Sequence, residues 1–345
     1  MNRIDVWNYI ILGIVTFILV VSITPLLRKL AIKIDFLDYP NIHHKSHLQP
    51  TPYLGGLAIL IGIIGTISIA LGLQGNRVEI LIASFTIAPS ILLAFIGLID
   101  DKYNLSPIPR FLGQNLIAFA TCLVIVSREE LGSPTGNTII DLVISVIWVV
   151  GITNAINFFD NIDGGAAGTI TVIASAILII SILNQQILLS AISVVMATAS
   201  LGFLVWNFEP AKIYMGDTGS LFLGFLLAIL TIRLDSSTNS LLSSFLIPFL
   251  LLAVPILDTS VAVLSRLKRK ISPFQGGKDH LSHRLQRIGS TKRRTVYVLW
   301  LGSILFCALA ITVLISEQIE FFVFFLAIAL WTSLLIFFLR TPDSD

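Results

Sequence analysis

Acidic side chains gather in three short segments of this chain. GLIDDKYNLSP places Asp100 and Asp101 side by side, NAINFFDNIDGG places Asp160 and Asp163 three residues apart, and KIYMGDTGSLFLG contains Asp217. Hard oxygen ligands of this kind select Mg²⁺ or Mn²⁺ over zinc or copper. Because Mg²⁺ usually binds one or two protein carboxylates together with substrate phosphates, the segments predict phosphoryl-type transfer on a pyrophosphate compound.

Two of these segments also have a structural interpretation. Asp100 and Asp101 end a hydrophobic segment, where two carboxylates face the negative end of a helix macrodipole. Lys102, a divalent ion or a proton can compensate them, or the helix end can simply be solvated. Asp217 precedes Thr-Gly-Ser, where Asp is a favoured helix N-cap. The functional alternative is a metal ligand beside a helix N-terminus that helps to hold phosphate, and the two roles are compatible.

Asn154, Asn157 and Asn161 are spaced to share one face of a helix. Asparagine is costly against lipid, so this face is expected to point into the protein or into a wet cleft. Together with the neighbouring carboxylates it suits a nucleobase, a sugar or a metal-bound water, and hydrogen bonding between helices is the alternative. Asp258 lies inside a hydrophobic segment, and it is either functional or the salt-bridge partner of Arg266.

All histidines of the chain fall in two polar stretches that are rich in basic residues. They are His43, His44, His47, His280 and His283. No cysteine accompanies them, which disfavours zinc. Lys45, Lys278 and Arg284 lie beside them, so we expect phosphate binding, with chance placement in polar loops as the alternative.

Hydrophobic segments separate these polar stretches. We place eleven of them at 7–26, 54–73, 80–99, 111–126, 139–157, 166–183, 187–205, 219–233, 241–264, 296–315 and 320–339. The 345 residues are 55% hydrophobic and 12% charged, about half the charge of a soluble domain. Most segments approach the ~20 apolar residues that cross a bilayer. The sequence therefore predicts an all-α polytopic membrane protein with about 11 transmembrane helices, forming one domain over 1–345.

The basic residues predict the orientation of these helices. With the N-terminus outside, only four of the 22 Lys and Arg residues fall outside, namely Arg3, Arg77, Arg128 and Arg233. The C-terminus and the candidate active site are then cytosolic. The basic loop 265–295 is expected to contact anionic lipid headgroups as well. The net charge of +2 gives no reason to invoke nucleic acid.

An ion-coupled secondary transporter is the main alternative to an enzyme, because polar residues within spans also mark ion pathways. Transporters usually bind their substrates near the bilayer midplane. Here the polar groups cluster at one surface, and only Asp258 lies deeper. The distribution favours an enzyme that works at the boundary between lipid and water.

Five motifs carry a resemblance to a known family. PTPYLGG, GLIDDK, NAINFFDNIDGG, NFEPAKIYMGDTGSLFLG and the loop SPF…DHLSHRL occur in this order. Together they resemble the polyprenyl-phosphate N-acetylhexosamine-1-phosphate transferases of glycosyltransferase family 4, multispanning bacterial enzymes that start lipid-linked glycan synthesis. The branch that transfers GlcNAc-1-phosphate to undecaprenyl phosphate, for teichoic acid, O-antigen (lipopolysaccharide) and enterobacterial common antigen, is the most similar. The MurNAc-pentapeptide translocase of peptidoglycan synthesis is a more distant relative.

The resemblance implies a reaction and a place in the cell. In the bacterial plasma membrane, undecaprenyl phosphate attacks the β-phosphorus of UDP-GlcNAc, UMP leaves, and undecaprenyl-diphospho-GlcNAc remains in the inner leaflet. MurNAc-pentapeptide or another UDP-N-acetylhexosamine is the alternative donor. The lipid phosphate is already largely ionised at pH 7, so direct attack is expected, and a covalent intermediate on Asp100 is the alternative. Related enzymes are often dimers, so a homodimer is possible.

The resemblance and the residues together predict the site. The predicted catalytic residues are Asp100, Asp101, Asp160 and Asp163. The predicted ligands of Mg²⁺, or of Mn²⁺ in its place, are Asp217 and Asp100. The predicted substrate-binding residues are Lys45, Asn154, Asn157, His280, His283 and Arg284. The family's last-loop motif often reads His-x-His, whereas this chain has His280-Leu-Ser-His283, which leaves open which histidine contacts phosphate.

Overall fold

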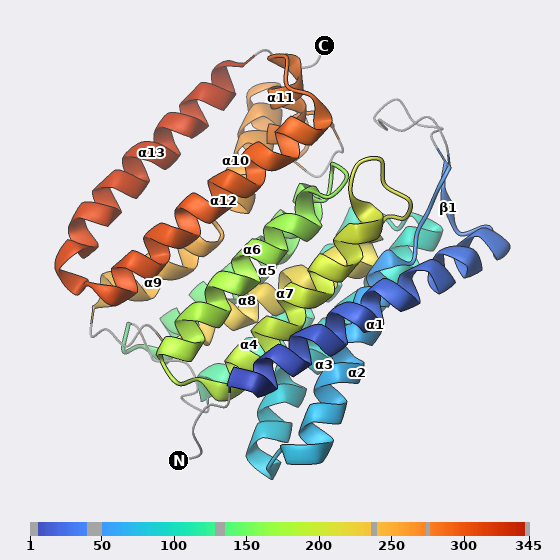
Figure 1. Ribbon diagram of the computed structural model, residues 1–345. Coiled ribbons are helices and arrows are strands. Elements are labelled where there is room, and N and C mark those ends of the chain that lie inside the picture. Colours follow the sequence, from blue (N-terminus) through green and yellow to red (C-terminus); the bar gives the residue numbers. More distant parts are fainter. Residues whose placement is uncertain (1–5, 40–49, 128–134, 236–239, 274–276, 342–345) are drawn as a thin grey trace.

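The computed structural model describes residues 6–39, 50–127, 135–235, 240–273 and 277–341 (Figure 1). The helices are α1 Val6–Lys33, α2 Gly55–Gln74, α3 Arg77–Tyr103, α4 Pro107–Ser127, α5 Thr138–Phe159, α6 Gly165–Leu183, α7 Ile187–Asn207, α8 Gly216–Ile232, α9 Leu241–Leu251, α10 Ala253–Lys268, α11 Leu281–Arg287, α12 Lys292–Ile315 and α13 Glu320–Arg340, with a 3₁₀ turn η1 at Glu317–Ile319. Strands β1 Leu37–Asp38 and β2 Thr51–Pro52 form a short antiparallel pair.

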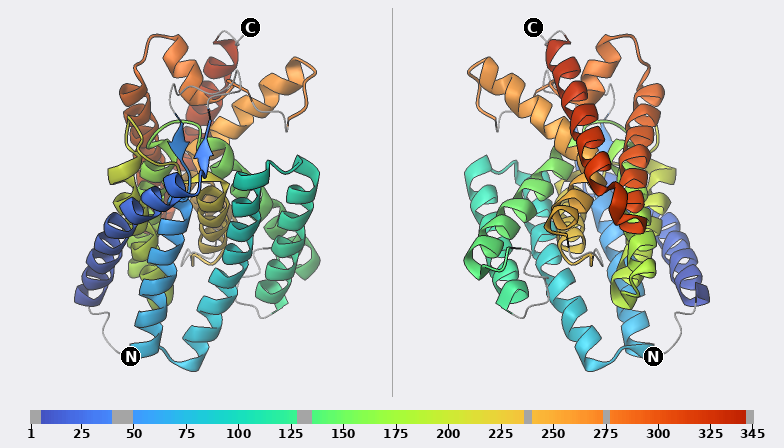
Figure 2. Two further views of the ribbon diagram at one scale, coloured as in Figure 1. Left: turned by 90° about the vertical axis from the view of Figure 1, so that its right-hand side faces the viewer. Right: turned by 90° about the vertical axis from the view of Figure 1, so that its left-hand side faces the viewer.

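Every predicted hydrophobic segment is helical, which confirms the all-α polytopic class. Nine described helices are long and apolar enough to cross a membrane, and α9 and α10, bent by 74° at Leu252, make a tenth span if they cross together. The remaining predicted segment, α8, has 17 residues and is shorter than a full span. Helix α1 begins at one end of the bundle, and α13 ends at the opposite end (Figures 1 and 2). Which end faces the cytosol stays a prediction.

Helix α8 is the centre of the bundle. All its residues from Thr218 to Thr231 are buried, and it packs mainly on α3 and α5. Its first turn lies unusually close to its neighbours, because a Cβ on Gly97 of α3 or on Gly56 of α2 would overlap the α8 backbone. Glycine is the residue that permits such backbone approach. The start of α8 is therefore held in place by two neighbouring helices.

The β1–β2 pair attaches a loop segment to this same end of α8. Leu37 pairs with Pro52, and the carbonyl of Pro52 accepts a hydrogen bond from the Tyr214 N–H at 2.9 Å. The Tyr214 carbonyl in turn accepts from the Gly55 N–H at 3.0 Å. These backbone bonds fix the segment before α8 against the start of α2, and so they position one wall of the cavity described below.

Candidate active site

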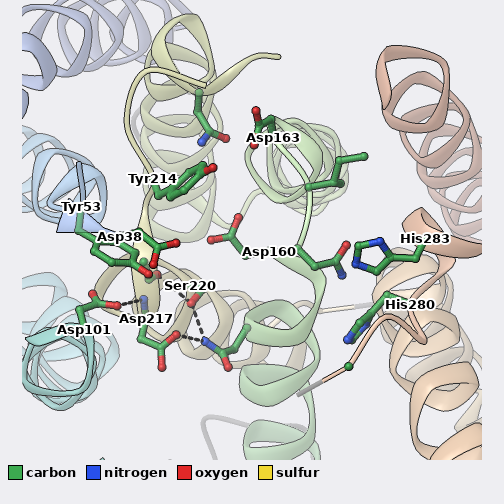
Figure 3. A pocket seen from close by; sticks show the side chains of 16 residues that line it. Asp38, Tyr53, Asp101, Asp160, Asp163, Tyr214, Asp217, Ser220, His280 and His283 are labelled. Carbon is green, nitrogen blue, oxygen red and sulfur yellow. Dashed lines mark hydrogen bonds between the residues drawn. The ribbon is translucent and has the colours of Figure 1, made fainter. Parts of the chain in front are cut away.

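A cavity of about 330 Å³ lies where α3 and α5 end and α8 begins (Figure 3). It is lined by Asp38, Tyr53, Asp101, Asn157, Asp160, Asn161, Ile162, Asp163, Asn207, Tyr214, Gly216, Asp217, Ser220, Gly277, His280 and His283. The structure thus gathers seven predicted site residues from four separate segments around one space. Asp38, Tyr53 and Tyr214 also line it, and sequence reasoning missed all three.

Asp101 caps the start of α8 from the neighbouring helix α3. Its carboxylate accepts hydrogen bonds from the Asp217 N–H at 2.7 Å, the Thr218 N–H at 3.0 Å and the Thr218 hydroxyl at 2.7 Å. The N-cap position itself, Met215, has no side-chain cap. Of the two interpretations of Asp217, the N-cap role is therefore excluded, since Asp101 satisfies the free N–H groups that the start of α8 leaves. This arrangement leaves the Asp217 side chain available to the cavity.

The Asp217 carboxylate is held from both sides. Its Oδ1 accepts from Asn157 Nδ2 at 2.8 Å, and its Oδ2 accepts from Arg110 Nη1 at 2.6 Å. Asn157 also donates to the Ser220 hydroxyl at 2.9 Å. Arg110, on the first turn of α4, forms an ion pair with Asp100 as well. The residue that compensates Asp100 is therefore Arg110, which sequence reasoning overlooked, and Lys102 is exposed above the Tyr103 ring.

Asp160 and Asp163 follow the end of α5 and belong to opposite parts of the cavity. Figure 3 shows Asp160 between the Asp101–Asp217 side and the two histidines. Burial, and then repulsion from Asp101 and Asp163, raises the pKa of Asp160 to about 7. Asp163 accepts a hydrogen bond from the Ala211 N–H at 2.9 Å and so ties this loop to the segment before α8. The pKa of the Asp160 carboxyl group therefore lies near neutral pH.

The two histidines of the last loop differ in their surroundings. His280 Nδ1 lies 2.7 Å from Asp258 Oδ2, and its Nε2 lies 3.2 Å from Arg266 Nη2. Because a guanidinium can only donate, His280 Nε2 accepts and Nδ1 carries the proton. Asp258 therefore orients His280. The alternative that Asp258 pairs with Arg266 is excluded, since Arg266 pairs with Asp279.

His283 faces the cavity with its ring less constrained (Figure 3). The His283 ring lies 6.5 Å from the His280 ring, measured between centroids. In the described part of the chain, no hydrogen bond holds the nitrogens of His283. Burial, and then the nearby His280, lowers the pKa of His283 to about 4. His283 is thus a neutral imidazole at pH 7, with both nitrogens available to a ligand.

Two predicted substrate-binding residues, Arg284 and Asn154, do not line the cavity, and a third lies outside the described residues. Arg284 is fully buried and donates to the Phe338 carbonyl at 2.6 Å and the Ser265 hydroxyl at 2.6 Å, so it ties α11 to α13 and α10. This corrects its predicted substrate contact to a structural role. Asn154 donates to Gln114 Oε1 at 2.8 Å between α5 and α4, which is the helix–helix alternative. Lys45, like the three histidines of the first polar stretch, lies outside the described residues.

The charge of the lining bears on the predicted metal. Among the described residues no group of three or more His, Cys, Asp or Glu is arranged to hold a metal ion. Mg²⁺ does not require one, since it commonly uses one or two carboxylates with substrate phosphates and water. Five aspartates line the cavity, whereas no Lys or Arg among the described residues does. The donor set of Asp217 and Asn157 therefore fits a hard divalent cation, and a pyrophosphate would be repelled without one.

Comparison with known proteins shows the family of this chain. Residues 82–235 match the family described as glycosyl transferase family 4. A probable undecaprenyl-phosphate N-acetylglucosaminyl 1-phosphate transferase of Bacillus subtilis is 36% identical over 309 residues, covering 86% of this chain and 83% of that protein. A decaprenyl-phosphate N-acetylglucosaminephosphotransferase of Mycolicibacterium smegmatis is 35% identical, covering 86% and 80%. A phospho-N-acetylmuramoyl-pentapeptide-transferase of Staphylococcus saprophyticus is 31% identical, covering 84% and 93%.

Proposed function

The chain belongs to glycosyl transferase family 4, and we propose that it transfers GlcNAc-1-phosphate from UDP-GlcNAc to undecaprenyl phosphate in the bacterial plasma membrane. The relatives and the fold identify the chain as a polyprenyl-phosphate N-acetylhexosamine-1-phosphate transferase with many membrane helices. GlcNAc is the favoured sugar because the N-acetylglucosamine transferases are 33–36% identical to this chain, against 31% for the N-acetylmuramoyl-pentapeptide transferase. Tyr53 and Tyr214 line the cavity, with ring centroids 6.3 Å apart and ring planes tilted by 58°, and they offer aromatic surface to a nucleobase.

The acidic cavity without lysine or arginine in its described lining is the observation that carries the proposal. Both reactants are anions, so a bound Mg²⁺ would neutralise their repulsion and stabilise charge on the departing UMP. Asp217 and Asn157 would hold that ion. Asp160 and His283 face the same space and would position the donor. In the transfer, an oxygen of the lipid phosphate bonds to the β-phosphorus while the α–β bridging bond breaks and UMP keeps the oxygen.

The lipid phosphate needs no strong base, because its second pKa is about 6 and it is largely ionised at pH 7. Direct attack is therefore proposed in place of a covalent intermediate on Asp100, whose carboxylate is already bound to Arg110 and to the Leu105 N–H at 2.7 Å. Exchange of labelled UMP into UDP-GlcNAc in the absence of any lipid acceptor would contradict direct attack, because only a covalent enzyme intermediate releases UMP reversibly without an acceptor.

The proposal is tested by a membrane assay with UDP-[¹⁴C]GlcNAc, undecaprenyl phosphate and Mg²⁺, with and without EDTA. We expect label in the lipid phase, UMP in the water phase, and loss of both with EDTA. Asp217→Asn should lose most turnover, whereas the matched Asp235→Asn, an exposed carboxylate outside the cavity, should retain it. Label transfer only from UDP-MurNAc-pentapeptide or UDP-GalNAc would replace the donor. No transfer from any of them by folded protein would reject the proposed function.

A further inference from the structure

Arg110 joins two carboxylates that come from different helices. It lies on the first turn of α4, and its Nη1 contacts Oδ2 of Asp100 on α3 and, at 2.6 Å, Oδ2 of Asp217 on α8. The side chains of Arg110 and Asp217 are 20% and 24% exposed, so the pair is only partly screened by solvent. Arg110 is not part of the cavity lining, and it approaches Asp217 from outside that lining.

Both oxygens of Asp217 are engaged in this arrangement. Oδ1 accepts from Asn157 and Oδ2 accepts from Arg110, so a divalent cation at Asp217 would have to share each oxygen with a hydrogen-bond donor or displace that donor. The amide of Asn157 can rotate and offer its own carbonyl oxygen as a ligand. A guanidinium stays protonated in proteins, and the Arg110 charge lies 2.6 Å from Oδ2, so a divalent cation on the same carboxylate would repel Arg110 and favour its withdrawal.

Asp100 gives Arg110 a place to withdraw to. Its Oδ2 already contacts Arg110, and its Oδ1 is fixed by the Leu105 N–H at 2.7 Å. Arg110 can therefore release Asp217 and keep one ion pair, without leaving a buried charge alone. The two carboxylates differ in their access to the cavity. Asp217 lines the cavity, whereas Asp100 does not and its side chain is only 8% exposed.

We propose that Arg110 is the resident counter-ion of Asp217 and that a divalent cation replaces it there, leaving Arg110 on Asp100. The inference rests on the proposed function in one respect, namely that Asp217 binds the metal. It assigns Asp100 the task of holding Arg110 in place of a role as metal ligand or base. A consequence is weak cation binding in the empty protein, so that the cation is retained mainly when a donor pyrophosphate supplies further oxygen ligands.

The test measures Mn²⁺ binding to the purified full chain by electron paramagnetic resonance, without any substrate. Arg110→Gln removes the competing cation, and we expect its Mn²⁺ dissociation constant to fall by at least about tenfold, equivalent to ~1.4 kcal/mol. The control Lys102→Gln removes the same charge from the exposed end of α3 and should change it less than about twofold. Combining Arg110→Gln with Asp217→Asn should abolish the gain.

Arg110→Lys covers the case in which Arg110→Gln does not fold. A lysine keeps the charge but lacks the planar fork, so it should hold Asp217 less firmly and tighten Mn²⁺ binding by about threefold or more. Unchanged or weaker binding in the folded Arg110 variants, with Asp217→Asn defective, would overturn the exchange alone. Equal Mn²⁺ binding by Asp217→Asn and wild type would overturn the metal role of Asp217 and the exchange with it, and the label-transfer assay would still judge the reaction separately.

Discussion

Asp101 has either a structural role, as the cap of α8, or a catalytic role, and Asp101→Asn distinguishes the two. The carboxylate accepts three hydrogen bonds at the start of α8. An asparagine oxygen can still accept from the Asp217 N–H, and its amide can donate to the Thr218 hydroxyl. The Thr218 N–H would then lose its acceptor, at a cost of ~1.5–3 kcal/mol for a bond to a charged group. Losing a negative charge at a helix N-terminus adds ~0.3–1 kcal/mol.

The sum of about 2–4 kcal/mol predicts a clear loss of stability. At roughly 2 °C per kcal/mol for a large chain, the midpoint of thermal unfolding in detergent should fall by about 4–8 °C. Scans must be run at one rate, because membrane-protein unfolding is often irreversible. Well below the midpoint, transferase turnover should stay within about tenfold of wild type, since the Asp217 N–H keeps its acceptor and α8 keeps its start.

Thr218→Val is the matched control for this prediction. It removes one of the three donors to Asp101 and leaves both backbone bonds in place. Because the two side chains share one interaction, the double variant should lose less stability than the two single losses added together. If Asp101→Asn melts within about 1 °C of wild type and yet loses turnover by more than a hundredfold, the capping argument is refuted and Asp101 takes part in the chemistry.

Three further outcomes follow from the site. Asp160 has a folded pKa near 7, above its unfolded value, so its charge destabilises the protein increasingly as pH rises from about 4 to 7; Asp160→Asn should therefore melt higher than wild type at pH 8 in EDTA, with the difference vanishing toward pH 4, and an equal gain at both pH values would contradict this. His283→Ala should raise the KM for the donor by tenfold or more with normal melting, with partial rescue by His283→Asn, whereas His280→Ala should lower the melting temperature because both its ring nitrogens are bonded; reversed phenotypes would show that the phosphate contact belongs to His280. Arg284→Gln should cost ~3–5 kcal/mol of stability, as expected when a buried charge network is broken, with KM unchanged in the protein that folds, and a KM defect without destabilisation would restore its predicted substrate contact.

The fold was largely predictable because hydrophobicity is a local signal. Ten of the eleven apolar segments each form one helix, and the segment 241–264 forms α9 and α10. Among the ten single helices, only α8, at 17 residues, is shorter than a span. Its shortness follows from its position, since a helix enclosed by its neighbours need not match the thickness of a bilayer. The 74° bend between α9 and α10 was not predicted, because hydrophobicity is continuous over 241–264; Pro248 and Pro255, on either side of Leu252, are the signal that was overlooked.

The site was predictable where one segment carries several polar residues, and less so where partners come from afar. The cluster of Asn157, Asp160 and Asp163 was predicted from the spacing of these residues within one segment. The cap of α8 by Asp101 joins residues more than a hundred positions apart, so local N-cap preference pointed to Asp217 instead. Tyr53 and Tyr214 gave one signal, their places inside the PTPYLGG and KIYMGDTGS motifs, which were used for the resemblance but not for the lining.

The roles of two arginines were predicted wrongly, one by omission and one by assignment to substrate binding, for the same physical reason. Arg110 was overlooked in the sequence and Arg284 was assigned to substrate binding, because both lie among the basic residues of the predicted cytosolic side. In the structure both are consumed by protein partners, and so is Arg266, which pairs with Asp279 behind His280. The cations of the site therefore stand in an outer layer, each bonded to a protein acceptor, while the described lining presents carboxylates, amides and neutral imidazole.

This layering decides how an anionic substrate can enter. A cavity with cationic walls would bind a pyrophosphate or a lipid phosphate directly and would hold the UMP product just as well. A cavity with acidic walls binds neither anion strongly unless a cation arrives with it, and two anionic reactants can then share that cation while the protein supplies orientation. For the proposed function, the acidic lining and the arginines behind it lead to one prediction. Metal and donor are expected to bind together, and UMP is expected to leave with the metal after transfer.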